Sequence, residues 1–463
     1  MAEEFDVVVI GAGPAGENAA GRCAQGGLRV ALVEAELVGG ECSYWACMPS
    51  KALLRPGEAL AAARRVPGAS EAVTGELHAG AVLAWRDQIV NHYDDTDQVK
   101  WVDGVGVELV RGRGRLGGER AVLVESPEGT RRLVAGRAVV VATGSAASVP
   151  PIEGLRDMRV WDSRDVTAAK QVPRRLLVLG AGVVAVEMAQ AWKRLGAEEV
   201  TIVSRDGRLL AREEPFVGDE LRRAFEAEGI VVRCGTTVAA CRRQGADGPV
   251  TLSLEDGAEL RGDELLVAAG RRPRTSDLGL EAVGLEPGGV IAVDEQLRAI
   301  GVPEGWLYAV GDANGRALLT HQGKYQARLC ADHILGKDVE AVADHRAVPR
   351  VIFTDPQVTA VGLTERQARD QGVDARVVTY PTGQVAGSAV AGRKPVGTSQ
   401  LVIDEGRRVI VGATFTGYGV AELLHAATVA IVGEVPLDRL WHAVPSFPTV
   451  SEVWLRLLES YGL

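Results

Sequence analysis

Two cysteines lie five positions apart in the segment GGECSYWACMPSK (residues 39–51), which begins with a glycine pair and ends with a lysine. A helix rises 1.5 Å per residue, so Cys42 and Cys47 on one regular helix stand about 7.5 Å apart along its axis. A disulfide requires Cα atoms within about 7 Å of each other. Pairing therefore requires Cys42 to lie before the helix, or the first turn to be distorted. From the spacing alone, the two residues are buried apolar side chains, metal ligands or a redox pair.

Composition restricts these alternatives. Six cysteines in 463 residues are too few for a secreted disulfide framework, and no His/Cys cluster has zinc-ligand spacing, so we expect no metal site. The net charge of −10 argues against nucleic-acid binding. No apolar run reaches the roughly 18 residues of a membrane helix. The acidic start runs straight into a strand, which predicts no signal peptide and a cytoplasmic protein. We expect the other cysteines to be small buried side chains: Cys23, Cys234, Cys241 and Cys330.

A nucleotide-binding unit precedes the cysteines. FDVVVIGAGPAGENAAGRCAQGGLRVALVEAE predicts a strand, a glycine turn, a helix and a second strand. Gly11 makes the tight turn, Gly13 lets the backbone approach a pyrophosphate, and Gly16 lets helix and strand pack closely. Glu34 ends the second strand, near the position about 20 residues on where an acid binds the ribose hydroxyl. The segment predicts a site for a dinucleotide without a 2′-phosphate.

The same unit recurs at RRLLVLGAGVVAVEMAQAWKRLGAEEVTIVSRD, where Gly180 and Gly182 occupy the first two glycine positions. Ala185 replaces the third glycine. The chain has more than one nucleotide-binding unit, as its length predicts, because single hydrophobic cores stop growing near 250–300 residues.

The second unit ends in Ser204–Arg205 where the first ends in Glu34. A carboxylate at this position repels a 2′-phosphate, whereas an arginine pairs with it. Arg208 and Arg212 reinforce this charge. The alternative is a solvated basic turn. The pattern favours NADPH over NADH.

The remaining chain alternates apolar strands with glycine turns. Residues 139–154, 265–275 and 306–315 each predict a buried strand, and the last of them ends on Gly311–Asp312. From about residue 345 the alternation indicates antiparallel strands, followed by apolar helical stretches at 420–433 and 451–459. This change in the pattern of residues predicts a separate C-terminal domain.

These segments together resemble the FAD-dependent pyridine nucleotide-disulfide oxidoreductases of class I, the family of dihydrolipoamide dehydrogenase, glutathione reductase and mercuric reductase. The resemblance covers nearly the whole chain. It includes, in the family's order, GAGPAG, GGECSYWACMPSK, VATGS, GAGVVAVEMA, AAGRRP, VGDAN, FTDPQVTAVGLTE and PTVSE. It implies that Cys42 and Cys47 form a redox-active disulfide beside the flavin, with Cys47 next to the flavin and Cys42 facing the acceptor.

The resemblance also implies the fold and the remaining site residues. We expect an α/β fold with two Rossmann-like domains, for FAD (1–150 and 272–344) and NAD(P) (151–271), and an α+β dimerisation domain (345–463). Lys51 is expected beside the flavin, paired with Glu187, where a cation stabilises reduced flavin and thiolate. The cofactor-binding residues, with Lys51 among them, are expected to be Gly11, Gly13, Gly16, Glu34, Gly40, Gly114, Thr143, Gly144, Gly180, Gly182, Ser204, Arg205, Gly270, Asp312 and Thr320.

The sequence departs from the resembled family near its C-terminus. Many members carry a His-Pro-Thr-x-x-Glu signature, whose histidine serves the partner subunit as acid–base. This chain has PSFPTVSE, with Phe447 at the histidine position and Glu452 at that of the orienting catalytic glutamate. Phenylalanine cannot transfer a proton, and His442 is the nearest substitute. Mercuric reductase also lacks the histidine but carries a C-terminal cysteine pair, whereas no cysteine follows Cys330 here. Soluble transhydrogenase usually keeps only one cysteine.

We expect an FAD-dependent NADPH oxidoreductase that passes electrons through the disulfide to a small acceptor such as a quinone, because quinones accept electrons without that proton relay. The alternatives are a dihydrolipoamide dehydrogenase or other disulfide reductase, with His442 or water as the base, and a low-turnover flavoprotein subunit or redox sensor. We expect a two-fold homodimer, because GVAELLHAATVAIVG leaves apolar surface exposed on one subunit. Phe447 and Glu452 of one subunit are then expected to face Cys42 of the other.

Overall fold

The computed structural model describes residues 2–463, which form two compact units. The first comprises residues 2–49, Asp87–Ser148 and Arg271–His345. The second comprises Ser50–Arg86, Val149–Gly270 and Arg346–Leu463. Residues Ser50–Arg86, which the sequence analysis assigns to the first domain, therefore cluster with the second unit. The predicted three-domain boundaries stay a prediction.

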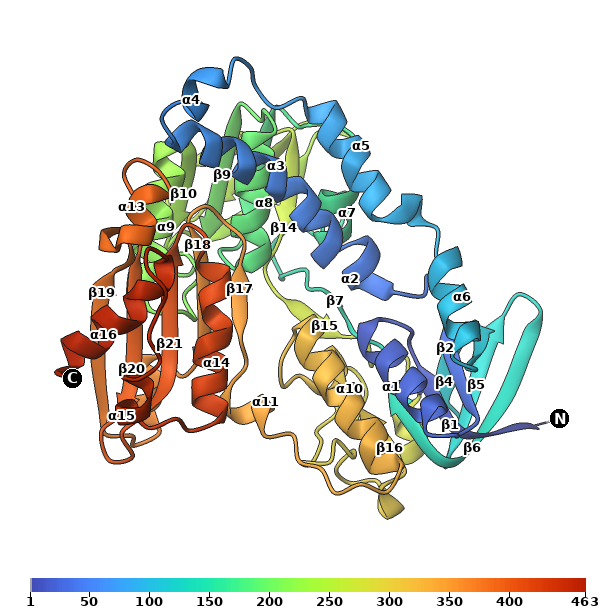
Figure 1. Cartoon of the computed structure of the whole chain (residues 1–463). Coiled ribbons are helices and arrows are strands. Elements are labelled where there is room, and N and C mark those ends of the chain that lie inside the picture. Colours follow the sequence, from blue (N-terminus) through green and yellow to red (C-terminus); the bar gives the residue numbers. More distant parts are fainter. Residues whose placement is uncertain (1) are drawn as a thin grey trace. The chain divides into compact units, whose positions relative to one another are not determined.

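The first unit is built on a seven-stranded mixed sheet of order β3-β2-β1-β6-β5-β4, with β16 paired to β6 (Figure 1). Its central strand β1 pairs in parallel with both neighbours, so that Val8 lies between Ala31 and Val139. Strands buried on both faces are expected to be continuously apolar, and the residues Val7–Ile10 are buried. The strands are β1 (Ala2–Ile10), β2 (Val30–Glu34), β3 (Glu108–Arg111), β4 (Arg113–Leu116), β5 (Ala121–Ser126), β6 (Gly129–Val141) and β16 (Leu307–Ala309).

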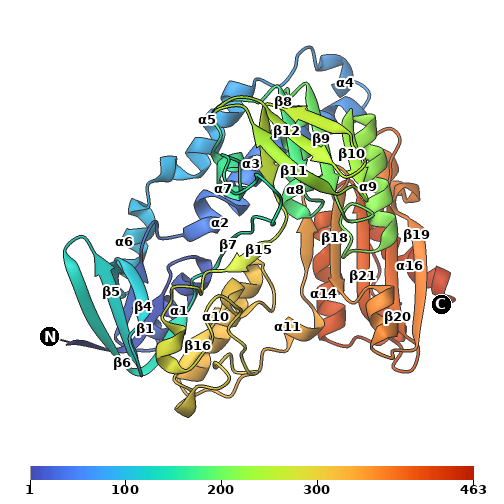
Figure 2. The same cartoon turned by 180° about the vertical axis from the view of Figure 1, so that it is seen from behind.

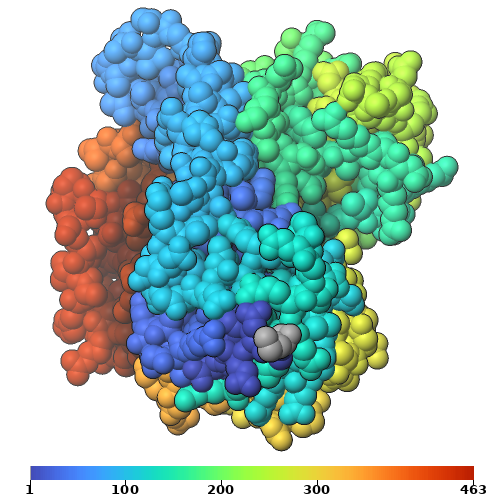
Figure 3. Space-filling view, turned by 90° about the vertical axis from the view of Figure 1, so that its right-hand side faces the viewer, coloured from blue at the N-terminus to red at the C-terminus, as the bar shows by residue number. Residues whose placement is uncertain are grey.

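Helices α1 (Pro14–Gln25) and α10 (Thr320–Ile334) pack against each other in this unit. Proline at the first position of α1 suits a helix start, because its missing N–H has no partner there in any case. Antiparallel β7 (Ser145–Ala147) and β15 (Arg271–Pro273) form a small ladder. Figure 3 shows the N-terminal segment in blue beside the β4–β6 segment in cyan and teal.

The second unit contains a parallel sheet of order β10-β9-β8-β14 and an antiparallel sheet β11-β12-β13 (Figure 2). Helix α8 (Val183–Arg194) follows β8 and is buried along most of its length. The other elements are β8 (Arg175–Leu179), β9 (Glu199–Ser204), α9 (Pro215–Ala227), β10 (Ile230–Cys234), β11 (Val238–Arg243), β12 (Val250–Leu254), β13 (Glu259–Gly262) and β14 (Glu264–Val267).

The C-terminal part of the second unit is a five-stranded antiparallel sheet of order β17-β18-β21-β20-β19. Helices α14 (Leu424–Val432) and α16 (Val453–Tyr461) cover one face of it (Figures 1 and 2) and share an apolar core with it. The antiparallel pattern predicted after residue 345 is confirmed. The strands are β17 (Arg350–Ile352), β18 (Gln357–Gly362), β19 (Ala375–Pro381), β20 (Thr398–Asp404) and β21 (Val409–Gly417).

The cysteine segment is not one regular helix. Helix α2 (Gly40–Tyr44) ends before α3 (Cys47–Arg65) begins, so Cys42 lies ahead of the helix that starts at Cys47. The remaining helices are α4 (Ala69–Ala72), α5 (Ala79–Ile89), α6 (Thr96–Gly104), α7 (Ser163–Ala168), α11 (Ala343–Arg346), α12 (Glu365–Asp370), α13 (Ala386–Val390) and α15 (Leu437–Leu440). Short 3-10 turns occur at 91–93, 280–283, 303–305, 311–314, 382–384, 420–423 and 450–452.

The α/β fold class predicted from the sequence is confirmed. Within residues 2–463, no helix is long and apolar enough to cross a membrane. The same residues contain no group of three or more His, Cys, Asp or Glu side chains arranged to hold a metal ion. Of the four scattered cysteines, Cys23, Cys241 and Cys330 are buried as predicted, whereas Cys234 at the end of β10 is half-buried.

Candidate active site

The first glycine turn joins β1 to α1 and leaves open space beside Gly13. Gly11 has φ +99°, and a Cβ there would lie 2.5 Å from the carbonyl oxygen of Ala142. A Cβ at Gly16 would lie 1.8 Å from the Gly11 oxygen, so only glycine permits this packing. At Gly13 nothing lies within 4 Å of a built Cβ. The surroundings of the three glycines therefore fit the separate roles that a dinucleotide-binding turn requires.

Glu34 ends β2 with its carboxylate fixed by the backbone. Oε2 accepts a hydrogen bond from the Ala12 N–H at 2.7 Å, and Oε1 accepts one from Glu36 at 2.7 Å. Two backbone donors orient the carboxylate beside the glycine turn, where a ribose hydroxyl binds in this class of fold.

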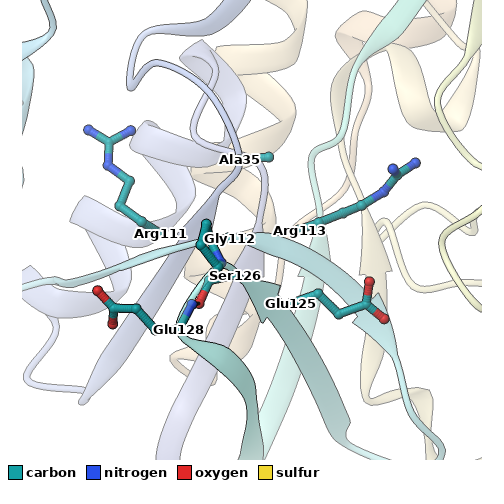
Figure 4. Close-up of a pocket in the computed structure, with 8 residues that line it drawn as sticks. Ala35, Arg111, Gly112, Arg113, Glu125, Ser126 and Glu128 are labelled. Carbon is teal, nitrogen blue, oxygen red and sulfur yellow. Dashed lines mark hydrogen bonds between the residues drawn. The ribbon is translucent and has the colours of Figure 1, made fainter.

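A cavity of about 380 Å³ begins at the next residue, Ala35. Figure 4 shows it between the turn Arg111–Arg113 and the β5–β6 turn at Glu125–Glu128. Gly112, with φ +149°, makes the step from β3 to β4. Gly114 packs against β1 and β2, because a Cβ there would lie 2.9 Å from Ile10 and 3.0 Å from Val33. The cavity thus lies at the carboxyl ends of strands, where ligands bind in open α/β sheets.

The carboxyl ends of β6 and β16 carry a polar cluster. Ser145 donates a short hydrogen bond to Asp312, and the Arg271 Nε donates to the Ser145 hydroxyl at 2.7 Å. Thr143 Oγ1 is buried without a hydrogen-bond partner among residues 2–463. A buried hydroxyl without a partner costs free energy, so this atom fits one that a bound cofactor would satisfy. Gly144 has φ +69° and open space beyond it.

The two cysteines of the segment meet as free thiols. Cys42 Sγ is within hydrogen-bond range of Cys47 Sγ. Thr320 Oγ1, at the first position of α10, lies 3.2 Å from Cys47 Sγ. Gly39 and Gly40 make the approach to α2 with φ +109° and +56°, and a Cβ at Gly40 would lie 2.8 Å from the Gly13 Cα. The break between α2 and α3 therefore satisfies the condition that the spacing imposed on pairing.

The environment of Cys42 opposes ionisation of its thiol in the reduced pair. The hydrogen bond to Cys47 raises the pKa of Cys42 well above its usual range, and burial raises it further. Thr320 and the ammonium group of Lys324 lower it. An opposite charge near a thiol favours the thiolate, which is the nucleophilic form.

In the second unit, Lys51 and Glu187 form an ion pair. Lys51 Nζ donates to Glu187 Oε2 at 2.8 Å, and Glu187 is 3% exposed. The other carboxylate oxygen accepts the backbone N–H of Phe353 at 2.9 Å, and the Lys51 ammonium lies 4.8 Å from the centre of the Phe353 ring. A buried carboxylate with both oxygens satisfied holds the lysine in one position.

The second glycine turn repeats the geometry of the first. A Cβ at Gly180 would lie 2.4 Å from the carbonyl oxygen of Ala268, whereas Gly182 faces open space. Ala185, at the third position, is fully buried. Gly270, at φ +129°, also faces open space. The turn has room for a second dinucleotide at the amino end of α8.

Arg205 and Arg208, after the end of β9, differ in their hydrogen-bond partners. Ser204 is buried, and its Oγ accepts the Asp206 N–H at 3.1 Å. Arg208 donates to the carbonyl oxygens of Ala211 and Glu213, both at 3.1 Å, so it braces its own loop. Arg205 is exposed, and its guanidinium makes no ion pair or hydrogen bond within residues 2–463. Arg205 is therefore the arginine that is available to a ligand.

The C-terminal segment PSFPTVSE has Phe447 where the resembled family has its histidine. Phe447 is 75% exposed. Glu452 is 7% exposed and pairs with Arg456 at 2.6 Å, while its other oxygen accepts the Ala386 N–H at 3.2 Å. His442 is exposed on the same segment. Glu452 thus has structural partners inside its own unit.

The profile of the pyridine nucleotide-disulphide oxidoreductase family matches residues 5–327, and that of its dimerisation domain matches residues 348–457. The chain belongs to this family. It is an FAD-dependent flavoprotein that binds pyridine nucleotides, as the sequence predicts. Mercuric reductase from Shigella flexneri is 34% identical over 94% of this chain and 77% of its own. Dihydrolipoyl dehydrogenase 3 from Pseudomonas aeruginosa is 34% identical over 98% of this chain and 97% of its own.

A solved structure of similar fold is the Cu(II) complex of the HOCl-induced flavoprotein disulfide reductase RclA from Escherichia coli. It aligns with a TM-score of 0.86 at 25% identity and covers 99% of both chains. These relatives carry different names for different substrates, so family membership fixes the oxidoreductase class of this enzyme and leaves its acceptor open.

Several side chains of the two clusters were not predicted from the sequence. Ser145 and Arg271 stand beside predicted residues in VATGS and AAGRRP, so adjacency to those motifs is a usable signal. Phe353 lies in FTDPQ, far in sequence from Lys51, and no local signal marks it. Lys324 stands four residues after Thr320, a spacing that places both on one face of a helix.

Proposed function

We propose that this enzyme transfers electrons from NADPH, through FAD and the Cys42–Cys47 disulfide, to a small electron acceptor such as a quinone. The observation that carries the proposal is the contrast between its two halves. The thiol pair is assembled beside Thr320, whereas the C-terminal signature presents Phe447 in place of a proton-transferring histidine. Bound FAD supplies the two-electron link between the nucleotide and the disulfide.

The chain's own residues supply the rest of the chemistry. In the reducing half, the two electrons and one proton of the NADPH hydride break the sulfur–sulfur bond and leave a Cys42 thiol and a Cys47 thiolate. In the oxidising half, the Cys42 thiol loses its proton, the sulfur–sulfur bond forms again, and the acceptor gains two electrons, that proton and a second proton from water. A quinone thereby becomes a hydroquinone. We assign Cys42 to contact the acceptor and Cys47 to face the flavin, with Lys51, held by Glu187, as the cation beside the flavin.

Cofactor placement follows the two glycine turns. We assign FAD to the turn of Gly11, Gly13 and Gly16, with its ribose on Glu34 and its adenine in the cavity beside Ala35 and Gly112. The unpartnered Thr143 hydroxyl and the Asp312 carboxylate are assigned to the flavin end. The open space at Gly13 and the orientation of Glu34 support this placement.

We expect NADPH to be preferred over NADH, and Arg205→Glu to reverse the preference by roughly 10- to 100-fold. One charge-assisted contact to a 2′-phosphate contributes about 1.5–3 kcal/mol, and Arg205 is exposed at the end of β9 without a partner among residues 2–463. The measurement is kcat/KM for both nucleotides with one acceptor.

The matched control for this prediction is Arg223→Glu, which makes the same charge change at an exposed position of α9. It should leave the nucleotide ratio within about twofold, because an exposed charge far from the ligand is screened by salt. Equal efficiency with both nucleotides in the unaltered enzyme contradicts the assignment of Arg205.

We also propose a two-fold homodimer in which Phe447 and Glu452 of one subunit face Cys42 of the other. The matched dimerisation domain supports it. So do exposed apolar side chains between α14 and the signature, namely Val429, Val432, Trp441, Val444 and Phe447, at 55%, 50%, 38%, 84% and 75% exposure. Contiguous exposed apolar surface usually marks an interface.

A dihydrolipoamide dehydrogenase is the second candidate, because a relative of that name aligns over nearly the whole chain. In this alternative His442 or water replaces the missing base. Losing a general acid–base commonly lowers a rate by about 10²–10⁴-fold. His442→Ala with unchanged lipoamide turnover removes the histidine from this role.

Steady-state turnover separates the candidates. NADPH with a naphthoquinone is expected to turn over faster than NADH with lipoamide. Lipoamide turnover like that of a family member with the histidine contradicts the quinone proposal. Rapid flavin reduction by NADPH without reduction of any acceptor favours a redox sensor or a flavoprotein subunit.

A further inference from the structure

A lysine lies on the helix that contacts the thiol pair. Lys324 follows Thr320 by four residues on α10, so the two side chains share one face of the helix, one turn apart. Thr320 Oγ1 lies 3.2 Å from Cys47 Sγ, which brings this helix face to the cysteines. The ammonium group of Lys324 interacts electrostatically with Cys42.

Among the residues that the structure describes, no counter-ion lies at hydrogen-bond distance from Lys324. It is half-buried, and its ammonium makes no hydrogen bond or ion pair within residues 2–463. Its other charged neighbour is Glu17 of α1. Removing an ammonium partly from water is unfavourable unless a negative charge lies nearby. A group that becomes anionic during the reaction satisfies that requirement.

We propose that Lys324 is a positioning residue for Cys42, whose sulfur it stabilises as the thiolate during attack on an acceptor. It supplies the stabilising charge that a protonated histidine would bring, and Phe447 cannot bring one. The proposal deepens the function proposed above and rests on it for the identity of the acceptor. The effect of Lys324 on the ionisation of the Cys42 thiol does not depend on the proposed function.

The other groups around Cys42 leave Lys324 as the effective cation. Cys47 contributes a hydrogen bond and Thr320 a hydroxyl dipole. Glu41, next to Cys42 in α2, is paired with Arg274 at 2.7 Å, so these two charges largely cancel.

Glu17 opposes Lys324 only in part near neutral pH. Burial raises the pKa of Glu17 to about 7, and the charge of Glu34 raises it as well, although Lys324 lowers it. Glu17 therefore gains and loses its proton near neutral pH. Its negative charge weakens the pull of Lys324 on the thiolate as the pH rises above 7.

Alkylation of the reduced enzyme tests the proposal without any acceptor. The holoenzyme is reduced with dithiothreitol, desalted anaerobically and treated with iodoacetamide from pH 5 to 10. Modification of Cys42 is then quantified by peptide mass spectrometry. In Lys324→Met the pH at which Cys42 reaches a fixed alkylation rate (the alkylation midpoint) should rise by about 1 unit, since a nearby opposite charge shifts a pKa by 1–3 units. The rate at pH 7 should then fall about tenfold.

Three further variants identify the cause of such a shift. Lys324→Arg keeps the charge and should restore the midpoint to within about 0.3 unit. Glu17→Gln removes the opposing carboxylate and should lower the midpoint. Arg328→Met removes a cation one further turn along α10 and should leave the midpoint unchanged, because that exposed charge is screened by solvent.

An unchanged Cys42 midpoint in Lys324→Met overturns the proposal, whatever Glu17→Gln does. Equal shifts in Lys324→Met and Arg328→Met also overturn it, because they indicate a general field effect. Failure of the unaltered enzyme to reduce a naphthoquinone contradicts the proposed function instead, and the alkylation profile then still decides the role of Lys324.

Discussion

Replacing Cys42 with serine is expected to lower NADPH-dependent naphthoquinone reduction by at least ~100-fold, or about 2.7 kcal/mol in transition-state free energy. Serine cannot form the bond to Cys47 that releases two electrons. Reduction of the flavin by NADPH should survive within about twofold, because it precedes the thiol step. Steady-state turnover with the quinone and rapid-mixing absorbance without it measure the two steps separately.

Cys234→Ser is the matched control for this prediction. Cys234 is half-buried at the end of β10, away from the segment of paired thiols in sequence, and should be replaceable with little change in turnover. Quinone turnover within about twofold of the unaltered enzyme in Cys42→Ser shows that the acceptor takes its electrons directly from the flavin.

The double substitution Val429→Asp and Val432→Asp is expected to dissociate the dimer and lower acceptor reduction by at least ~100-fold. Both side chains are about half exposed on α14 in the single chain. A carboxylate buried in an interface without a partner costs several kcal/mol. Sedimentation measures the assembly, and flavin reduction by NADPH should persist in the monomer because hydride entry uses one chain.

Point substitutions test the dimer more cleanly than removal of residues 440–463. That segment includes α16, whose Val453 and Leu457 are fully buried in the C-terminal core, so its removal would also unfold that core. Ile300→Asp, at a position 58% exposed in the first unit, controls for the added charge. A monomer that still reduces its acceptor at full rate contradicts the shared pocket.

The sequence predicts most strongly the features whose cause is local. Gly11 and Gly180 are required by a positive φ and by a carbonyl oxygen within 2.5 Å of any added Cβ, and both carry the motif that predicts them. The position of Glu34 beside the glycine turn was predicted from the number of residues between them. The antiparallel C-terminal sheet follows from alternation of apolar and polar residues.

Features that depend on non-local contacts were not predictable from the sequence. The two residues between α2 and α3 are Trp45 and Ala46, and neither is a proline that would predict the break. The glycines before α2 permit the break but do not predict it. Thr320 reaches Cys47 across 273 residues of chain. Such contacts are set by how strands and helices pack together and leave no local pattern.

Glu452 stands at the position of the family's orienting glutamate but contacts other groups in this structure. The resemblance assigns it an orienting role toward a histidine. In the structure its two oxygens contact Arg456, one turn later, and the backbone of Ala386. The arginine is visible in the sequence at i+4 spacing, but the partner 66 residues away is not. Its catalytic role stays a prediction.

An anaerobic titration with NADPH, followed by absorbance, shows whether the Cys42–Cys47 disulfide takes part in electron transfer. We expect a long-wavelength band to appear as two electrons enter, because the reduced Cys47 would then carry a thiolate next to oxidised flavin. We expect this band to be lost in Cys47→Ser. Bleaching of the flavin at two electrons without that band in the unaltered enzyme would show that the disulfide takes no part, and would contradict the account.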